Sequence, residues 1–315
     1  MNPEENLYDE IKKFGYQIGA TYYKDKEELD KQNFSSRYWQ HPGENHKLKG
    51  TPFFHSNEND FIHFTSLDSL YYIINTGFIR LYNFHNMDDK LEMEYALAEL
   101  SFKQSSEKAK EELYCFSMCS SEKILLDETK EHLLWKLHGR DGRGAIIRVC
   151  IENNLDKWYL YHLSKVSYGI ERFLAIKKFN TDIDIEMLDN KICCFIKHPI
   201  YEFENEIRLV FDNTNPVTVT DIDKGKIYPI TYPDKLHKKE NTFYFQIPLI
   251  NFNNSNEAYL APNMQGEAFE IPKIKITEII LGYRYSEEDR INIQSKIGDK
   301  FNDVKIKITD LKRYY

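Results

Sequence analysis

The stretch YEFENEIRLVF (Tyr201–Phe211) alternates charged with apolar side chains, which predicts a β-strand. Such a strand places Glu204, Glu206 and Arg208 on one face and Ile207 toward the other. Two carboxylates spaced two residues apart on a rigid strand can stabilise a developing positive charge and activate a nucleophile nearby. Taken alone, the pattern fits a solvated outer sheet face with cross-strand ion pairs somewhat better than a reaction centre.

A second strand is predicted about 140 residues upstream, in FIHFT (Phe61–Thr65). It runs directly into a predicted helix, which Thr65 or Ser66 can cap and which Gly77 can end. His63 and Thr65 alternate on one face of this strand. Each has a plain structural interpretation, a hydrogen-bonded core histidine and a helix cap, and each can also face a ligand.

The amino-acid composition predicts a folded protein of the cytoplasm. The chain has 315 residues, a formal charge of -8, 41% apolar residues and five irregularly spaced cysteines. The negative charge argues against a protein that coats nucleic acid or an anionic membrane nonspecifically, and the odd cysteine count fits a reducing compartment. The N-terminus shows no secretory signal, and no apolar run reaches the ~20 residues that span a bilayer.

The periodic segments predict an α+β protein with one large domain over residues 59–315 and a polar, helical extension over 1–58. We expect a long helix from Met87 toward Lys110, helical structure over 173–197 and a loop or insertion near 212–242. Further strands and helices are predicted in the following segments: Phe78–Tyr82, Tyr114–Cys119, Glu131–Leu137, Ala145–Ile151, Phe243–Leu249, Ile274–Gly282, a helix after Ser286, and Val304–Ile308.

The sequence lacks the motifs of several common enzyme classes. The chain has no P-loop, dinucleotide glycine fingerprint, His-Glu-x-x-His helix or Gly-x-Ser-x-Gly elbow. Cys115 and Cys119 have no second pair at zinc spacing, and His132 and His138 make no metal face, so no metal is expected. Trp135 is expected in the core. Four basic residues lie close together in the sequence: Lys136, Arg140, Arg143 and Arg148. Such a cluster is more often part of a solvated loop. It is also compatible with a nucleic-acid-processing enzyme.

The spaced motifs together resemble the ADP-ribosyltransferase superfamily. The opening motif is similar to that of toxins that ADP-ribosylate DNA. The remaining motifs resemble those of a large bacterial family of uncharacterised domains that begin with a His-aromatic-Thr sequence. The matching positions cover about residues 60–312: His63 to Gly77, Tyr82-Asn83 with Met87-Asp88-Asp89 and Glu92, Phe116-Ser117, Trp135, Gly144, Lys197, Tyr201, Glu204, Glu206, Arg208 and Ile279–Gly282. Toxins of the superfamily often have Arg where this chain has His63.

The resemblance implies a split, curved β core of two small sheets around a cleft that binds NAD+, flanked by helices. Glu206 would stabilise the oxocarbenium-like state at the nicotinamide ribose, and Glu204 would position or deprotonate the acceptor. An acidic strand shifted by two residues would exchange these roles. The resemblance also implies further contacts: His63, Thr65, Tyr71, Tyr82, Ser117 and Tyr168 for NAD+, and Arg143, Lys197 and Arg208 for substrate.

We therefore expect an NAD+-dependent ADP-ribosyltransferase that modifies a nucleic acid or a protein, as a toxin or anti-phage effector with a neutralising antitoxin or immunity partner. Neither a membrane partner nor a metal is expected. Alternatives are a non-catalytic nucleotide-binding or partner-binding module of the same fold, and the nucleic-acid-processing enzyme.

Overall fold

The computed structural model describes residue 10 and residues 59–87, 93–102, 106–152, 161–182, 190–213, 218–221, 226–229, 236–239, 242–253, 271–301 and 303–315. The predicted N-terminal extension, 1–58, lies outside this part of the chain except for Glu10. Much of the predicted insertion at 212–242 does so too.

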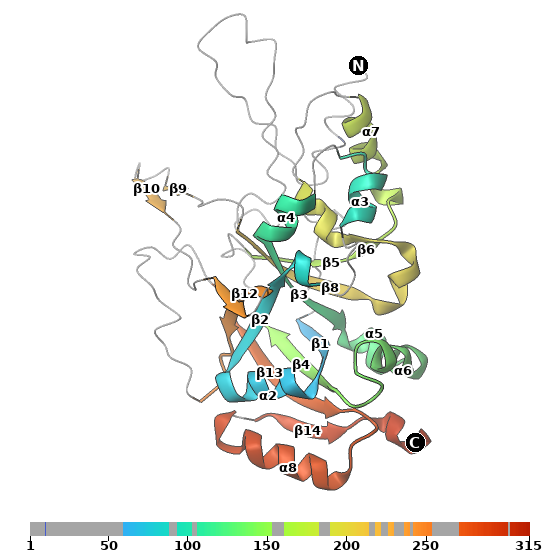
Figure 1. The fold of residues 1–315 in the computed structure, drawn as a ribbon, viewed down its shortest axis with the longest axis vertical. Coiled ribbons are helices and arrows are strands. Elements are labelled where there is room, and N and C mark those ends of the chain that lie inside the picture. Colours follow the sequence, from blue (N-terminus) through green and yellow to red (C-terminus); the bar gives the residue numbers. More distant parts are fainter. Residues whose placement is uncertain are drawn as a thin grey trace, which may run out of the picture.

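A mixed sheet of ten strands dominates the described residues, in the order β11-β12-β2-β3-β1-β4-β13-β14 (Figure 1). Off this path, β8 pairs with β3, and β5 pairs with β8. Only β13 and β14 pair in parallel within it. Several helices are also present, so the predicted α+β fold class is confirmed. The strands of the large sheet are β1 (Asp60–Thr65), β2 (Phe78–Asn83), β3 (Leu113–Ser120), β4 (Ala145–Ile151), β5 (Tyr161–Lys165), β8 (Glu206–Asp212), β11 (His237–Lys239), β12 (Thr242–Pro248), β13 (Ile274–Leu281) and β14 (Lys305–Ile308).

The sheet forks at β3. One edge of β3 pairs with β8 from Leu113 to Cys119. The other edge is divided, because β2 pairs with Tyr114 and Cys115 whereas β1 pairs with Cys119 and Ser120. β3 therefore joins two branches, one continuing through β2 and β12 and the other through β1, β4, β13 and β14.

Helix α2 (Leu67–Thr76) connects the two branches, from the end of β1 to the start of β2. Ser66, rather than Thr65, caps it: the Ser66 side chain accepts a hydrogen bond from the Ser69 amide. Gly77 ends the helix in the left-handed region at φ 71°, as predicted. Thr65 is instead the last residue of β1, opposite Ala145 of β4.

Three groups of buried side chains hold the fold together. The largest packs α2 and α8 (Glu287–Ile297) against the sheet. A second lies among α3 (Glu94–Glu99), β3 and residues 192–196. The third covers β1 and β4 with α5 (Ser121–Leu125) and α6 (Glu128–Leu137) and includes Trp135, which is fully buried as predicted.

Two predicted segments are wrong in detail, and the predicted loop or insertion is partly ordered as strands. The single helix predicted after Met87 is interrupted: the described residues of this segment form α3 and α4 (Ser106–Glu112), and Ser101 between them has a left-handed φ of 58°. The predicted start at 88–92 lies outside the described residues. The helical segment 173–197 contains α7 (Leu174–Asp182), a 3-10 helix at Asn190–Phe195 and the short strand β7 (Ile196–Lys197), which pairs with β6 (Ser167–Tyr168). The polar excursion contains a hairpin of β9 (Thr218–Asp221) and β10 (Lys226–Pro229).

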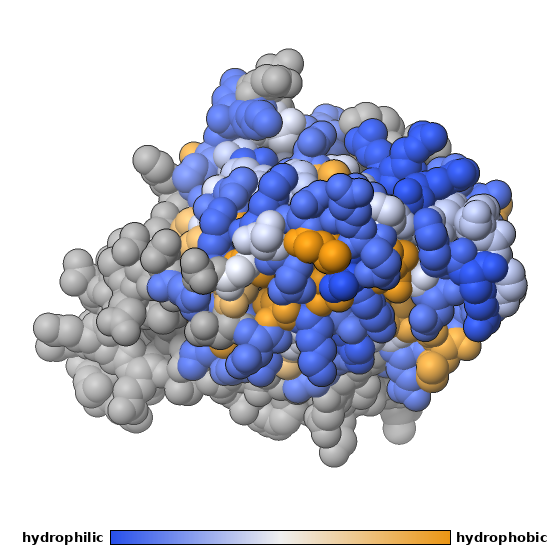
Figure 2. Space-filling view, turned by 90° about the horizontal axis from the view of Figure 1, so that it is seen from below, coloured by the Kyte–Doolittle hydropathy of each residue, from blue (hydrophilic) through white to orange (hydrophobic). Residues whose placement is uncertain are grey.

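The surface seen from below, the end at which α8 lies in Figure 1, is mainly hydrophilic, with hydrophobic residues exposed near its centre (Figure 2). None of the helices in the described part of the chain is long and apolar enough to cross a membrane.

Candidate active site

The acidic stretch begins as a helical turn and becomes a strand only at Glu206. Residues Pro199–Glu204 form the 3-10 helix η7, which His198 caps by accepting a hydrogen bond from the Ile200 amide. Asn205 then adopts a left-handed conformation at φ 46°, and β8 starts with the next residue. The prediction that Glu204 shares a strand face with Glu206 is wrong, because this turn separates them.

The strand is buried on both faces, so the alternative of a solvated outer face is also wrong. Every residue of β8 is buried, including Glu206, at 6% exposure, and Arg208, at 0%. A buried carboxylate and a buried guanidinium are stable only when each is paired. The two charges therefore belong to an internal network.

Lys197 of β7 joins the two carboxylates across the turn. Its Nζ lies 2.9 Å from Glu204 Oε2 and 3.2 Å from Glu206 Oε2, and its side chain is only 12% exposed. The ammonium also lies 4.8 Å from the centre of the Tyr201 ring. Glu204 and Glu206 thus meet at one cation although they come from different elements.

Arg208 sets the charge state of Glu206. Its Nε donates to Glu206 Oε1 at 2.8 Å, its Nη2 donates to Oε2 at 3.0 Å, and its Nη1 donates to the Cys194 carbonyl. Burial raises the pKa of the Glu206 carboxyl, but the charges of Arg208 and Lys197, with hydrogen bonds from Arg208 and Ser117, outweigh it and hold that pKa at about 2. Glu206 is therefore ionised at neutral pH. Because Arg208 is fully buried, its geometry fits positioning of Glu206 better than the predicted contact with substrate.

His138 approaches Glu204 from the other side. It follows α6 as the C-cap residue, and its Nε2 lies 3.2 Å from Glu204 Oε1. The predictions considered His138 only as a metal ligand and missed this pair. No sequence spacing signals it, since 66 residues separate the two partners.

His63 lies on β1 next to the fork. Its Nδ1 is 2.8 Å from the Ser117 carbonyl, which can only accept, so Nδ1 carries the proton. Burial lowers the pKa of His63 to about 4, partly offset by this hydrogen bond, and nearby His138 lowers it further. At neutral pH the ring is uncharged, and its Nε2 is an acceptor.

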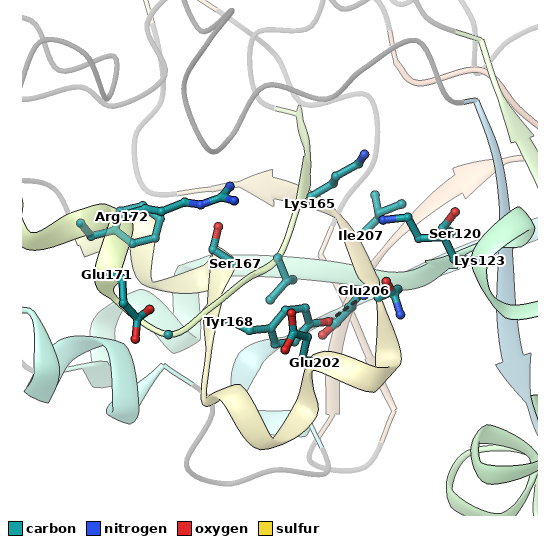
Figure 3. Close-up of a pocket in the computed structure, with 14 residues that line it drawn as sticks. Ser120, Lys123, Lys165, Ser167, Tyr168, Glu171, Arg172, Glu202, Glu206 and Ile207 are labelled. Carbon is teal, nitrogen blue, oxygen red and sulfur yellow. Dashed lines mark hydrogen bonds between the residues drawn. The ribbon is translucent and has the colours of Figure 1, made fainter. Parts of the chain in front are cut away.

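A pocket of about 340 Å³ lies beside Glu206 (Figure 3). Tyr168 also lines it, and the Glu206 amide donates to the Tyr168 hydroxyl at 2.8 Å. Burial and the adjacent Glu206 raise the pKa of Tyr168, so the phenol stays protonated. The lining includes three cations that the predictions missed and two further carboxylates: Lys123, Lys165, Arg172, Glu171 and Glu202.

The structure brings part of the predicted site together. Glu206 contacts three of the predicted residues, Tyr168, Lys197 and Arg208. A fourth, Ser117, helps to lower the pKa of the Glu206 carboxyl. Glu204 joins them through Lys197, and His63 contacts the Ser117 carbonyl. Thr65 pairs with Ala145 at the end of β1, and the remaining predicted residues have separate surroundings.

Tyr71 of α2 accepts a hydrogen bond from Lys296 of α8. The Tyr82 hydroxyl accepts one from Arg80. The carbonyl of Arg143 accepts one from the Tyr285 hydroxyl. Among the contacts of the described residues, none joins Tyr71, Tyr82 or Arg143 to the acidic pair.

The basic cluster near residue 140 is divided. Arg148 of β4 forms ion pairs with Asp60 and Glu278, whereas Lys136, Arg140 and Arg143 lie exposed around the end of α6. Within the described residues, no three His, Cys, Asp or Glu side chains are grouped so that they could hold a metal ion.

No protein-family model, curated protein or solved structure matches this chain. Its function is therefore inferred from the residues and the geometry of the site.

Proposed function

We propose that this protein is an NAD+-dependent ADP-ribosyltransferase that modifies a macromolecular acceptor, a nucleic acid or a protein. The main support is the buried acidic pair: Glu206, ionised and beside a pocket, and Glu204, joined to it through Lys197. A glycosyl transfer through a cationic state needs a fixed negative charge next to the sugar and a second group that handles the nucleophile.

The fork at β3 supports a split β core. His63 lies on the branch that begins with β1, whereas Glu206 begins the strand on the opposite edge of β3. Ser117 of β3 links them, because its carbonyl accepts from His63 and its side chain helps to lower the pKa of the Glu206 carboxyl. We propose that NAD+ binds beside this junction.

The residues around the site fit NAD+. Lys123, Lys165 and Arg172 line the pocket together with three carboxylates, and these cationic side chains can pair with a diphosphate. The Tyr168 ring offers a stacking surface for nicotinamide. The Nε2 atom of uncharged His63 can accept a hydrogen bond from the hydroxyl of the adenosine-side ribose.

In the proposed reaction the bond between the ribose C1′ and the nicotinamide nitrogen breaks. Nicotinamide leaves as a neutral molecule, because its ring nitrogen takes the bonding pair. The ionised Glu206 stabilises the positive charge on the sugar, and the acceptor forms the new bond to C1′ as it loses its proton. Glu204 positions the acceptor or helps to remove that proton.

Glu206→Gln tests the proposal, since it keeps the shape of the side chain and removes its charge. Purified protein is incubated with labelled NAD+ and a cell extract separated into protein, DNA and RNA. The wild type is expected to label one fraction, and Glu206→Gln to lower the rate about 100-fold or more. Loss of toxicity in cells that express the variant is expected in parallel.

The matched control is Glu288→Gln, which changes an exposed carboxylate in the first turn of α8 and should keep the wild-type rate. Circular dichroism and NAD+ binding by calorimetry establish that Glu206→Gln is folded. A folded Glu206→Gln protein that transfers ADP-ribose at the wild-type rate would refute the proposal.

One observation favours a second candidate, a nucleotide-binding module without turnover. Each carboxylate of the acidic pair already has a cationic partner, as in a network whose role is structural. Calorimetric binding of NAD+ with no release of nicotinamide over hours would support this module.

A further inference from the structure

His138 is the exposed member of the acidic network. Its side chain is 42% exposed, whereas those of Glu204 and Lys197 are 8% and 12% exposed. The predictions gave it no role. It is the group of the network that a molecule arriving from solvent can most easily reach.

The contact with Glu204 fixes the tautomer of His138. A carboxylate oxygen accepts hydrogen bonds, so the Nε2 atom that lies 3.2 Å from Glu204 Oε1 is the donor and carries the proton. The Nδ1 atom of an uncharged ring is then an acceptor. Lys197 holds the other oxygen, Oε2, at 2.9 Å, which fixes the orientation of the carboxylate that orients the ring.

His138 stands at the C-terminal end of α6, with the Glu204 carboxylate at its Nε2 atom. Glu204 contacts the ring directly, Lys197 holds the same carboxylate, and His63 interacts with the ring electrostatically. An imidazole held by a carboxylate, with its second nitrogen open, is the arrangement by which enzymes activate a nucleophile.

We propose that His138 is a catalytic base that acts on the acceptor, with Glu204 as its positioning residue. This inference rests on the proposed function. The acceptor nucleophile bonds to C1′ as nicotinamide leaves, and its proton moves to His138 Nδ1. Glu206 stabilises the sugar cation from the pocket side, so cleavage of NAD+ and activation of the acceptor depend on different residues.

The test separates these two steps. Each protein is given labelled NAD+ with the extract fraction that the wild type labels, and transfer and nicotinamide release are both measured. His138→Gln is expected to reduce transfer about 100-fold while nicotinamide release into water stays within about threefold of wild type. In His138→Ala, added imidazole is expected to restore much of the lost transfer. A purely structural histidine would not show this rescue.

His132→Gln and His132→Ala are the matched controls. His132 is on the same helix, and its ring stacks with Tyr283 and Tyr315 away from Glu204. They should transfer at the wild-type rate and gain nothing from imidazole. Unchanged transfer in His138→Gln, or no rescue of His138→Ala, would overturn the role of His138 while leaving the proposed function intact. A wild type that neither transfers nor hydrolyses would overturn the proposed function, and this role with it.

Discussion

Arg208 determines whether the acidic pair can exist inside the protein. Its guanidinium is fully buried and donates to both oxygens of Glu206. Replacing it with methionine keeps an apolar side chain of similar length but leaves Glu206 buried with only the more distant Lys197. We expect Arg208→Met to lower the free energy of unfolding by about 3–5 kcal/mol, measured by urea denaturation.

The double variant Arg208→Met, Glu206→Gln separates charge from packing. It removes both members of the pair, so it should be clearly more stable than Arg208→Met alone. If the double variant is as unstable as the single one, the cost comes from lost packing rather than from an unpaired carboxylate.

The sequence predicted which residues belong to the site better than it predicted how they are arranged. Glu204, Glu206, Lys197, Ser117 and Tyr168 were predicted and lie together. The hydrogen bond between His138 and Glu204, and the three cations of the pocket, could not be predicted. They come from elements that are distant in sequence, and such contacts leave no local periodicity.

Helix α2 offers a prediction about an element, because it sets the path from β1 to β2. Ser66→Ala should cost about 1 kcal/mol through loss of the N-cap. Gly77→Ala should cost more, since Gly77 has a left-handed φ of 71° and a β-carbon there would overlap the Phe252 ring. Thermal unfolding of both variants measures this order, and an equal or smaller effect at Gly77 would contradict it.

Strands were predicted well where the apolar pattern is strong and less well where turn chemistry competes with it. β1, β2, β3, β4 and β13 follow their predicted segments closely. The acidic stretch was predicted as one strand because charges alternate through it. Pro199 and Asn205 decide otherwise, since proline begins the 3-10 helix and asparagine tolerates the left-handed turn that precedes β8.

At the scale of the whole molecule, the fork was beyond prediction from the sequence. β3 pairs with three strands, and its partners lie up to about a hundred residues away. Strand patterns predict which residues form a sheet, but pairing order depends on long-range packing that a single sequence does not display. The fork matters because it places His63 and Glu206 on strands that flank the same β3.

His63 and Glu206 should make the free energy of unfolding of the whole molecule depend on pH in acid. The pKa of His63 is about 4 in the folded protein and 6.5 ordinarily, so the unfolded chain binds a proton more readily between those values. The free energy of unfolding should therefore fall from about pH 6.5 to pH 4, by at most about 3 kcal/mol through His63. Glu206, with a folded pKa of about 2 against 4.5, should cause a second fall between pH 4.5 and pH 2.

His63→Gln removes only the first of these falls. Urea unfolding of wild type and variant at pH 7, 5.5 and 4 compares the slopes, so any constant cost of the substitution cancels. We expect the variant to lose less stability than wild type across this range. Both should lose stability below about pH 4.5, because the unfolded chain then binds a proton at Glu206 that the folded protein takes up only near pH 2. Equal slopes between pH 6.5 and pH 4 would mean that His63 takes up a proton in the folded protein as easily as in the unfolded chain, and therefore that it is not the uncharged acceptor proposed for the ribose.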